Sequence, residues 1–295
     1  LATLDITSDP FRSLTLNNSK MQIHETIAGV RAAMRTAGRV VFVPTMGNLH
    51  DGHIALMRQA RAHGNAVVAS IFVNRLQFRP GEDFDKYPRT FEADCQRMVE
   101  AGVDHLFAPA EVELYPQAQS YYIEPPAEHA SILEGEFRPG HFRGVATVVM
   151  KLFSIVQPQA ALFGKKDYQQ FMVLSAMVRE FGMPIEVIPG ETVRAPDGLA
   201  LSSRNGYLTE AERAEAPRLY RVISELAAEA RSGARNFADL EARAMNILRI
   251  NGWLPDYVAF RKKLDLQLPS AHDSGLVVLA AARLGSTRLI DNLEV

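Results

Sequence analysis

Residues 40–53 read VVFVPTMGNLHDGH. The first four are β-branched or aromatic and end at a proline, which predicts a short buried strand. A helical pattern begins at His53 and stops at Gly64. In an open α/β sheet, ligands bind at the carboxyl ends of the strands, where helix N-termini point towards phosphate groups. The stretch therefore predicts an α/β fold with a phosphate-binding site at residues 44–53.

The same alternation of apolar runs and helical patterns continues along the chain. Strands are expected at residues 66–73, 105–108, 160–163 and 185–188, and helices at 90–101, 145–156 and 168–181. Strands that alternate with helices in this way form parallel sheets. The sequence therefore predicts a Rossmann-like parallel sheet with helices on both faces.

The pattern changes after Pro189. Thr209 and Glu212 form a capping box that predicts one long helix over residues 209–231, and a second helix is expected at 237–250. Residues 257–260, 276–281 and 288–290 have the character of a small antiparallel sheet. We therefore expect a nucleotide-binding catalytic domain at 21–190 and a smaller C-terminal α+β domain at 191–295.

The first 20 residues are weakly patterned and begin at Leu1, whereas Met21 opens an amphipathic stretch. We interpret residues 1–20 as a remnant of cloning and exclude them from the fold, with a native disordered leader as the alternative.

Composition narrows the class of protein. The net charge of −2 gives no electrostatic reason to expect nucleic-acid or membrane binding. No apolar run reaches the ~18 residues that a membrane-spanning helix needs. Cys95 is the single cysteine, which excludes an intrachain disulfide and a Cys-x-x-Cys metal site. We expect a location in the cytoplasm, whose reducing conditions fit this cysteine usage, and a cysteine-poor exported protein is the alternative.

Two histidines carry the chemistry of the opening stretch. His50 and His53 are three residues apart, so they share a face in the first helical turn. Gly52 lets the backbone approach a ligand closely. Two imidazoles at this place could donate hydrogen bonds to phosphate oxygens as negative charge develops. The alternatives are a surface turn and, less favoured, a zinc site, for which no third ligand lies nearby.

Other segments could supply positive charge. The sequence has no P-loop and no Gly-x-Gly-x-x-Gly fingerprint. Residues 164–167 follow the fourth strand, so a lysine there would emerge on the same edge of the sheet as the histidines. Residues 201–205 bring two hydroxyls and a guanidinium, a phosphate clamp at the domain junction. A solvated turn and a domain linker are the respective alternatives.

Two neutral amides, Gln77 and Gln170, lie after predicted strand ends. An amide can orient a small hydroxy acid without adding charge. The alternative for each is an ordinary surface glutamine.

Six segments resemble, in the same order, those of the pantothenate synthetases, a family of the nucleotidyltransferase superfamily that also includes class I aminoacyl-tRNA synthetases. They are residues 44–53, 72–78, 85–90, 140–145, 163–170 and 201–205. The resemblance is strong over residues 21–208 and loose beyond them. Arg75 departs from it, because the family usually has proline there, and this bears on the rigidity of the adjacent loop.

The resemblance implies a two-step reaction. Pantoate attacks ATP to give an acyl-adenylate and pyrophosphate, and β-alanine then displaces AMP. ATP is a substrate, Mg²⁺ accompanies it, and we expect a homodimer. The metal ligands are not identified by any motif.

The resemblance also implies site residues. Catalytic roles fall to His53, His50, Lys166 and Arg204. The expected ATP site comprises Met46, Gly47, Asn48, Leu49, His50, Asp51, Gly52, His53, Gly164, Lys165, Lys166, Asp167, Val193, Leu201, Ser202, Ser203 and Arg204. Pantoate is expected at Gln77, Gln170 and Asn74.

Two other functions remain open from the sequence. A nucleotidylyltransferase that makes a dinucleotide would share the histidine turn, but it should carry more Arg or Lys for its second phosphate. A non-catalytic nucleotide-binding regulator could share the fold, although it would not need both histidines and Lys166.

Overall fold

The computed structural model describes residues 12–16 and 19–295, and its larger sheet has seven strands in the order β1-β2-β5-β4-β3-β6-β7. The strands are β1 (Arg12–Leu16), β2 (Ser19–His24), β3 (Val40–Thr45), β4 (Ala66–Ile71), β5 (His105–Phe107), β6 (Ala160–Gly164) and β7 (Glu186–Gly190). β1 runs antiparallel to β2, and the other six strands are parallel. The predicted Rossmann-like parallel sheet is confirmed.

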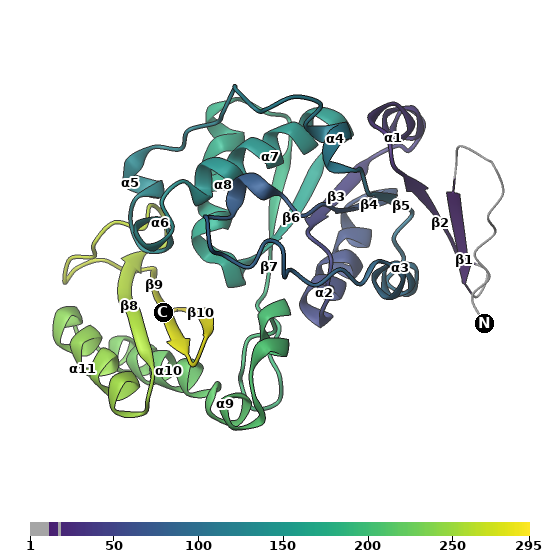
Figure 1. Cartoon of the computed structure of the whole chain (residues 1–295). Coiled ribbons are helices and arrows are strands. Elements are labelled where there is room, and N and C mark those ends of the chain that lie inside the picture. Colours follow the sequence, from purple (N-terminus) through teal and green to yellow (C-terminus); the bar gives the residue numbers. More distant parts are fainter. Residues whose placement is uncertain (1–11, 17–18) are drawn as a thin grey trace.

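Helices cover both faces of this sheet (Figure 1). On one face lie α2 (Asp51–Ala60) and α3 (Phe91–Glu100), and on the other lie α1 (Ile27–Met34), α7 (His141–Val156) and α8 (Tyr168–Glu180). Because side chains alternate along a strand, Val41 and Val43 enter one core while Val40 and Phe42 enter the other. Burial on both faces explains why these strands read as continuous apolar runs.

The strand order reverses direction between β3 and β6. From β3 the chain builds outwards through β4 to β5, and then returns to place β6 and β7 on the other side. A crevice forms at such a switch point, outside the carboxyl ends of the two strands. The segments after Thr45 and Gly164 therefore border one crevice.

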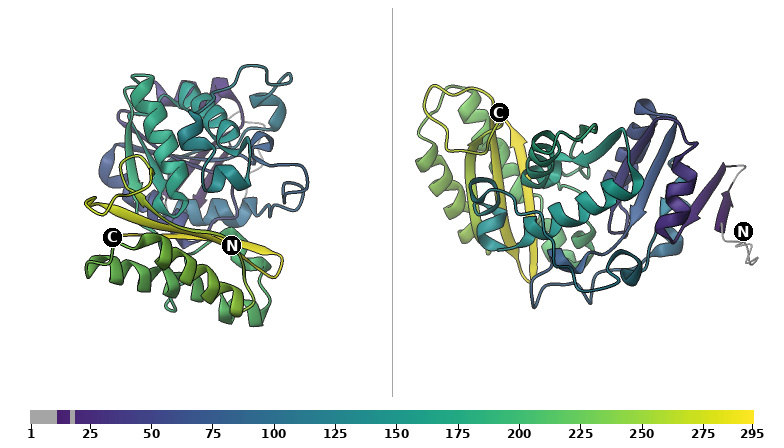
Figure 2. Two further views of the ribbon diagram at one scale, coloured as in Figure 1. Left: turned by 90° about the vertical axis from the view of Figure 1, so that its left-hand side faces the viewer. Right: turned by 90° about the horizontal axis from the view of Figure 1, so that it is seen from above.

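A second sheet follows, with the antiparallel order β10-β9-β8. It consists of β8 (Leu254–Lys262), β9 (Leu276–Leu284) and β10 (Thr287–Glu294). α10 (Arg218–Arg231) and α11 (Phe237–Ile250) cover one face. The other face packs against Leu133 and Tyr168, which belong to the part of the chain built around the larger sheet. The smaller sheet therefore lies alongside that part (Figure 2). The expected smaller α+β part is confirmed, and residue 190 remains our proposed boundary.

Short elements complete the described chain. They are α4 (Glu111–Leu114), α5 (Ala127–Ala130), α6 (Glu134–Phe137) and α9 (Glu210–Glu215), with 3-10 turns η1 (Arg61–His63), η2 (Arg75–Gln77), η3 (Lys165–Asp167) and η4 (Ser203–Tyr207). No helix within residues 12–16 and 19–295 combines the length and the apolar character needed to cross a membrane.

Two expectations were wrong. The single helix over 209–231 is divided into α9 and α10, because Pro217 has no N–H to continue the ladder and instead precedes the first turn of α10. The exclusion of residues 1–20 from the fold fails for Arg12–Leu16, which pairs with β2 at the sheet edge, and for Ser19 and Lys20, which belong to β2. Their origin as a remnant of cloning stays a prediction. Residues 1–11, 17 and 18 lie outside the described residues.

Candidate active site

Both histidines of residues 44–53 accept backbone hydrogen bonds at the N-terminus of α2. His50 is the N-cap, and its Nδ1 accepts the Gly52 N–H at 3.2 Å. His53 Nδ1 accepts the His50 N–H at 3.3 Å. A ring nitrogen that accepts a hydrogen bond carries no proton, so the neutral tautomer places the proton of each ring on Nε2. The ring centroids are 4.1 Å apart, which confirms the shared face.

Both rings are held in the neutral form. Burial, then His53, Lys166 and Arg97, lower the pKa of His50 from 6.5 to about 2. Burial is also the main reason that the pKa of His53 falls to about 4, although Asp167 opposes the shift. At neutral pH the pair therefore offers two uncharged Nε2–H donors.

The turn that precedes α2 depends on a buried carboxylate that the sequence analysis missed. Gly47 has φ +84°, and Asn48 follows at +50°, so the chain needs a glycine here. Asp94 of α3 is 2% exposed and accepts the N–H groups of Asn48 and Leu49, each at 2.8 Å. Arg97, one turn later, donates to the Leu49 carbonyl at 2.7 Å. An acidic residue on the apolar face of α3 was the available signal.

The crevice at the switch point holds a cavity of about 230 Å³. Fifteen of the predicted site residues line it, from both sides of the switch and from the chain after β7: Met46, His50, Gly52, His53, Asn74, Gln77, Gly164, Lys166, Asp167, Gln170, Val193, Leu201, Ser202, Ser203 and Arg204. Gln170 lies in the first turn of α8 and not in the turn before it. Among the described residues, the Lys166 ammonium has no hydrogen-bond or ion-pair partner, so it is available to an anion.

Five predicted ATP-site residues do not line this cavity, although the structure describes all of them. Leu49 packs in the core beneath α2. The N–H groups of Gly47, Asn48 and Leu49 go to Thr45 and Asp94. Asp51 pairs with Arg97 on the surface, and Lys165 pairs with Glu191 at 2.5 Å. These residues shape the turn and its flank, and their side chains or amides are already engaged.

The proposed phosphate clamp lies against the histidine turn. The Ser203 hydroxyl donates to the Asn48 carbonyl at 2.9 Å. Ser202 caps η4 by accepting the Arg204 N–H at 3.2 Å. Arg204 reaches into the cavity, and its Nε and Nη2 both donate to the Asp83 carboxylate at 3.1 Å. The structure thus brings residues 201–205 to the histidines, and it adds Asp83, which the sequence analysis missed.

Gln77 is held by its neighbours on the other wall. Its Oε1 accepts from Asn74 Nδ2 at 3.1 Å, and its Nε2 contacts the Met46 sulfur at 3.1 Å. Asn74 is 1% exposed and also accepts the Tyr115 hydroxyl at 2.9 Å. Its polar groups are therefore largely occupied, and its geometry is that of a residue which positions Gln77.

Helix α7 packs directly against the backbone of η2, with no side chain between them. A Cβ on Gly144 would lie 2.2 Å from the Leu76 carbonyl oxygen, a contact that no side chain tolerates. The Gly144 carbonyl accepts from Asn74 at 3.1 Å. Only glycine lets α7 and η2 meet at this distance.

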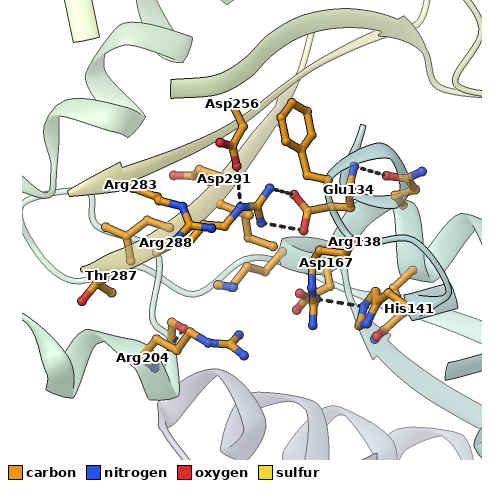
Figure 3. A pocket seen from close by; sticks show the side chains of 18 of the residues that line it. Glu134, Arg138, His141, Asp167, Arg204, Asp256, Arg283, Thr287, Arg288 and Asp291 are labelled. Carbon is orange, nitrogen blue, oxygen red and sulfur yellow. Dashed lines mark hydrogen bonds and ion pairs between the residues drawn. The ribbon is translucent and has the colours of Figure 1, made fainter. Parts of the chain in front are cut away.

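Arg138 and His141 also line the cavity, and no site role was predicted for them. Arg138 binds Glu82 through two contacts, Nε at 3.0 Å and Nη2 at 2.8 Å. Its Nη1 lies 3.1 Å from His141 Nε2 (Figure 3). His141 Nδ1 donates to the Gln77 carbonyl at 2.9 Å. Burial, followed by Arg138, lowers the pKa of His141 to about 4, so the ring stays neutral.

A second cavity of about 510 Å³ continues the first between the two sheets. The two cavities share seven lining residues: Arg138, His141, Lys166, Asp167, Gln170, Ser202 and Arg204. Its far wall is β10, where Asn292 donates to the carbonyls of Lys165 and Lys166 at 2.8 and 2.9 Å. The second sheet therefore helps to set the position of the lysine turn.

The two halves are joined by a buried ion-pair cluster. Glu134 of α6 takes two hydrogen bonds from Arg288 of β10, at 2.7 and 2.8 Å, and one from the Tyr257 hydroxyl at 2.9 Å. Arg288 also donates to Asp256 at 2.6 Å (Figure 3). The cluster lies on the wall of the larger cavity and fixes the second sheet against the first.

Within residues 12–16 and 19–295, no group of three or more His, Cys, Asp or Glu side chains could hold a metal ion. The cavity instead gathers cations and neutral donors around one crevice. Such an arrangement suits a polyanion and a small polar molecule bound side by side.

Comparisons with known proteins agree with this geometry. The sequence model of the family described as pantoate-beta-alanine ligase matches residues 21–294. The pantothenate synthetase of Leptothrix cholodnii is 59% identical to the chain, with 93% of this chain and 100% of that protein aligned.

Solved structures show the same fold. A crystal structure of pantothenate synthetase from Thermus thermophilus gives a TM-score of 0.88 at 46% identity, over 92% of this chain and 99% of that one. The pantoate-beta-alanine ligase of Francisella tularensis, in complex with beta-gamma ATP and beta-alanine, gives 0.78 at 34% identity, over 92% of this chain and 97% of that one.

Proposed function

Because this chain belongs to the pantoate–β-alanine ligase family, we propose how its cavity carries out the ATP-dependent condensation of pantoate with β-alanine. In the first step, a pantoate carboxylate oxygen attacks the α-phosphorus of ATP, which gives pantoyl adenylate and releases pyrophosphate. In the second step, the β-alanine nitrogen attacks the acyl carbon, loses a proton and displaces AMP. The product is the amide pantothenate.

The histidine pair supplies hydrogen-bond donors to the phosphates. Since Nδ1 of both rings accepts a backbone N–H, only the Nε2–H groups are free to contact a ligand. A ring in this state has no lone pair available, so neither histidine acts as a general base. Preorganised donors of this kind stabilise charge that develops in the transition state. This use of Nδ1 is the observation that carries the proposal.

Lys166 and Arg204 supply the positive charge. Lys166 is unpaired within the described residues, and Arg204 retains N–H groups that do not contact Asp83. We assign both to the triphosphate, with the hydroxyls of Ser202 and Ser203 beside them. Two anions must meet for adenylation, and cations that hold them in line reduce the barrier.

Gln77 and Gln170 bind pantoate in this proposal. Both line the smaller cavity, and Asn74 fixes the amide of Gln77 so that its remaining N–H can face a hydroxyl or carboxylate. The nucleoside is assigned to Gly164, Asp167 and the backbone of Val193, on the opposite border of the switch point.

Magnesium enters with ATP. Mg²⁺ keeps several waters and takes one or two carboxylates together with the phosphates of its substrate, so it needs no protein cage. The described residues contain no three-ligand cluster, so the ion would be held mainly by the phosphates and by water, and no motif identifies its protein ligands. When bound, the ion would neutralise phosphate charge. We also propose that the chain forms a homodimer, which sedimentation would test, and the cytoplasmic location stays a prediction.

The reaction is tested in two assays on the full chain. Pyrophosphate release from ATP and pantoate without β-alanine measures adenylation, and AMP release with β-alanine measures the complete reaction. His53→Ala should lower the adenylation rate ~10²–10³-fold, the loss seen when one preorganised donor is removed. A matched change at His272, which is exposed, should have no effect. Normal adenylation by His53→Ala would refute the role of the pair.

A further inference from the structure

Residues 79–89 line both cavities and contact the proposed phosphate clamp at residues 201–205. The segment holds two consecutive acids, Glu82 and Asp83, and each binds one cavity arginine through two hydrogen bonds. Glu82 takes Arg138, and Asp83 takes Arg204. Tyr87, in the same segment, lines the smaller cavity together with Ser203 and Arg204. One short stretch thus contacts Arg204 and borders the cavity that holds the clamp.

The contact with Asp83 orients Arg204 and occupies only part of its guanidinium. A guanidinium has five N–H donors. Asp83 takes one from Nε and one from Nη2, so the donors of Nη1 and one on Nη2 remain. Since Arg204 lines both cavities, these remaining donors are the ones available to a phosphate. Side-on binding of this kind fixes the plane of the guanidinium.

The residue after Asp83 belongs to a buried aromatic cluster. Phe84 and Tyr87 are 8% and 7% exposed, and Phe78 packs edge-on against both, at centroid distances of 5.4 and 6.0 Å. Arg75 covers this cluster, because its guanidinium carbon lies 3.9 Å from the centroid of the Phe84 ring.

Arg75 is itself bound to helix α4. Its Nε donates to Glu111 of α4 at 3.2 Å, while its guanidinium stacks on Phe84. A planar cation can make both contacts at once, whereas a lysine ammonium could not reproduce them. Arg75 therefore links α4 to Phe84, the residue next to Asp83.

We propose that Asp83 is a positioning residue that aims Arg204 at the phosphates, and that Arg75 anchors the 79–89 segment which carries Asp83. This inference rests on the proposed function, since it assigns the work of Asp83 to the adenylation step. Asp83 acts only through Arg204. Arg75 acts only through the segment.

A double-mutant cycle tests the first half. Asp83→Ala should lower kcat/KM for ATP in pyrophosphate release about 10–100-fold, by analogy with the loss seen when a residue that orients a metal ligand is removed. In an Arg204→Ala background the same change should have almost no effect, because its target is gone. The KM for pantoate should change little. The control is Arg243→Ala, which removes an exposed pair with Glu229.

The outcomes separate the inference from the proposed function. Normal adenylation by Arg204→Ala contradicts the proposed role of Arg204 itself. If Arg204→Ala is impaired but Asp83→Ala lowers the rate equally in both backgrounds, only the positioning role is refuted. Tighter ATP binding by Asp83→Ala also refutes it, because Asp83 would then compete with the phosphates.

The second half has a readout that does not depend on activity. Trypsin should cut after Lys86 or Arg89 severalfold faster in Arg75→Ala and in Arg75→Lys than in the wild type or in Arg243→Ala. The slower cleavage of the wild type reflects a segment that opens less often. Equal cleavage rates in all four proteins would refute the anchoring role of Arg75, whatever the kinetics show.

Discussion

Asp94→Asn changes one atom and should damage both the stability of the protein and its adenylation rate. Asp94 accepts the N–H groups of Asn48 and Leu49 and the Thr90 hydroxyl, at 2.8, 2.8 and 3.0 Å. Asparagine keeps one acceptor oxygen, so its NH₂ group must face one of the two backbone donors. A buried N–H left unsatisfied costs ~1–3 kcal/mol, and the surviving bond loses ~1 kcal/mol with the charge.

These terms give a loss of about 2–4 kcal/mol in the free energy of unfolding. A urea titration followed by circular dichroism should show a lower midpoint at an unchanged slope. Because the turn sets the position of His50, adenylation by the folded protein should fall ~10–100-fold, as expected when a reacting group is displaced by about 1 Å.

Glu92→Gln is the matched control. It makes the same chemical change on the exposed side of the same helix, and both measurements should stay at the wild-type values. If Asp94→Asn unfolds at the wild-type midpoint and adenylates normally, the buried carboxylate does not organise the turn.

Three further predictions follow from the same contacts. Gln77→Ala should raise the KM for pantoate and leave the KM for ATP nearly unchanged in the pyrophosphate assay, and a collapse of ATP binding alone would contradict the assignment. Burial, then His105, lowers the pKa of His24 to about 4. Between pH 6.5 and 4 the unfolded chain therefore binds a proton at His24 that the folded protein does not bind, and ~2–3 kcal/mol of stability should be lost as the pH falls through this range. Urea midpoints across this range should fall less steeply with pH in His24→Asn than in His272→Asn. Equal slopes would exclude His24 as the cause of the loss of stability at low pH. Arg288→Ala leaves the Glu134 carboxylate buried without its partner and should cost ~3–5 kcal/mol, measured as an earlier unfolding of the region around Trp253, whereas Arg243→Ala should not shift it.

The centre of the parallel sheet could be predicted because β3, β4 and β6 are buried on both faces. Val40 to Val43 form an uninterrupted apolar run, and the same holds for the strands that flank them. β2 escaped notice because it alternates, with Met21 and Ile23 buried and Gln22 partly exposed. An alternating stretch of this length has too few residues to separate a strand from a helix.

The candidate site could be predicted where a residue carries its own signal. His50, His53 and Lys166 follow strand ends, and the structure brings all three to one cavity. Asp83 and Asp94 could not be found in this way. Their partners lie far along the sequence, at Arg204 and at Asn48, and only the folded chain places them together.

His50 ties recognition to the integrity of a helix. The imidazole that lines the cavity also caps the N-terminus of α2, since its Nδ1 accepts the Gly52 N–H. Residues selected for activity commonly reduce stability, so replacing them often makes a protein more robust. At position 50 that exchange is narrow, because only a residue that itself caps a helix, such as Ser, Asp or Asn, can give up the imidazole donor and still accept the Gly52 N–H. Directed evolution towards heat tolerance in a library screened without substrate should therefore admit those residues at position 50 and reject apolar ones.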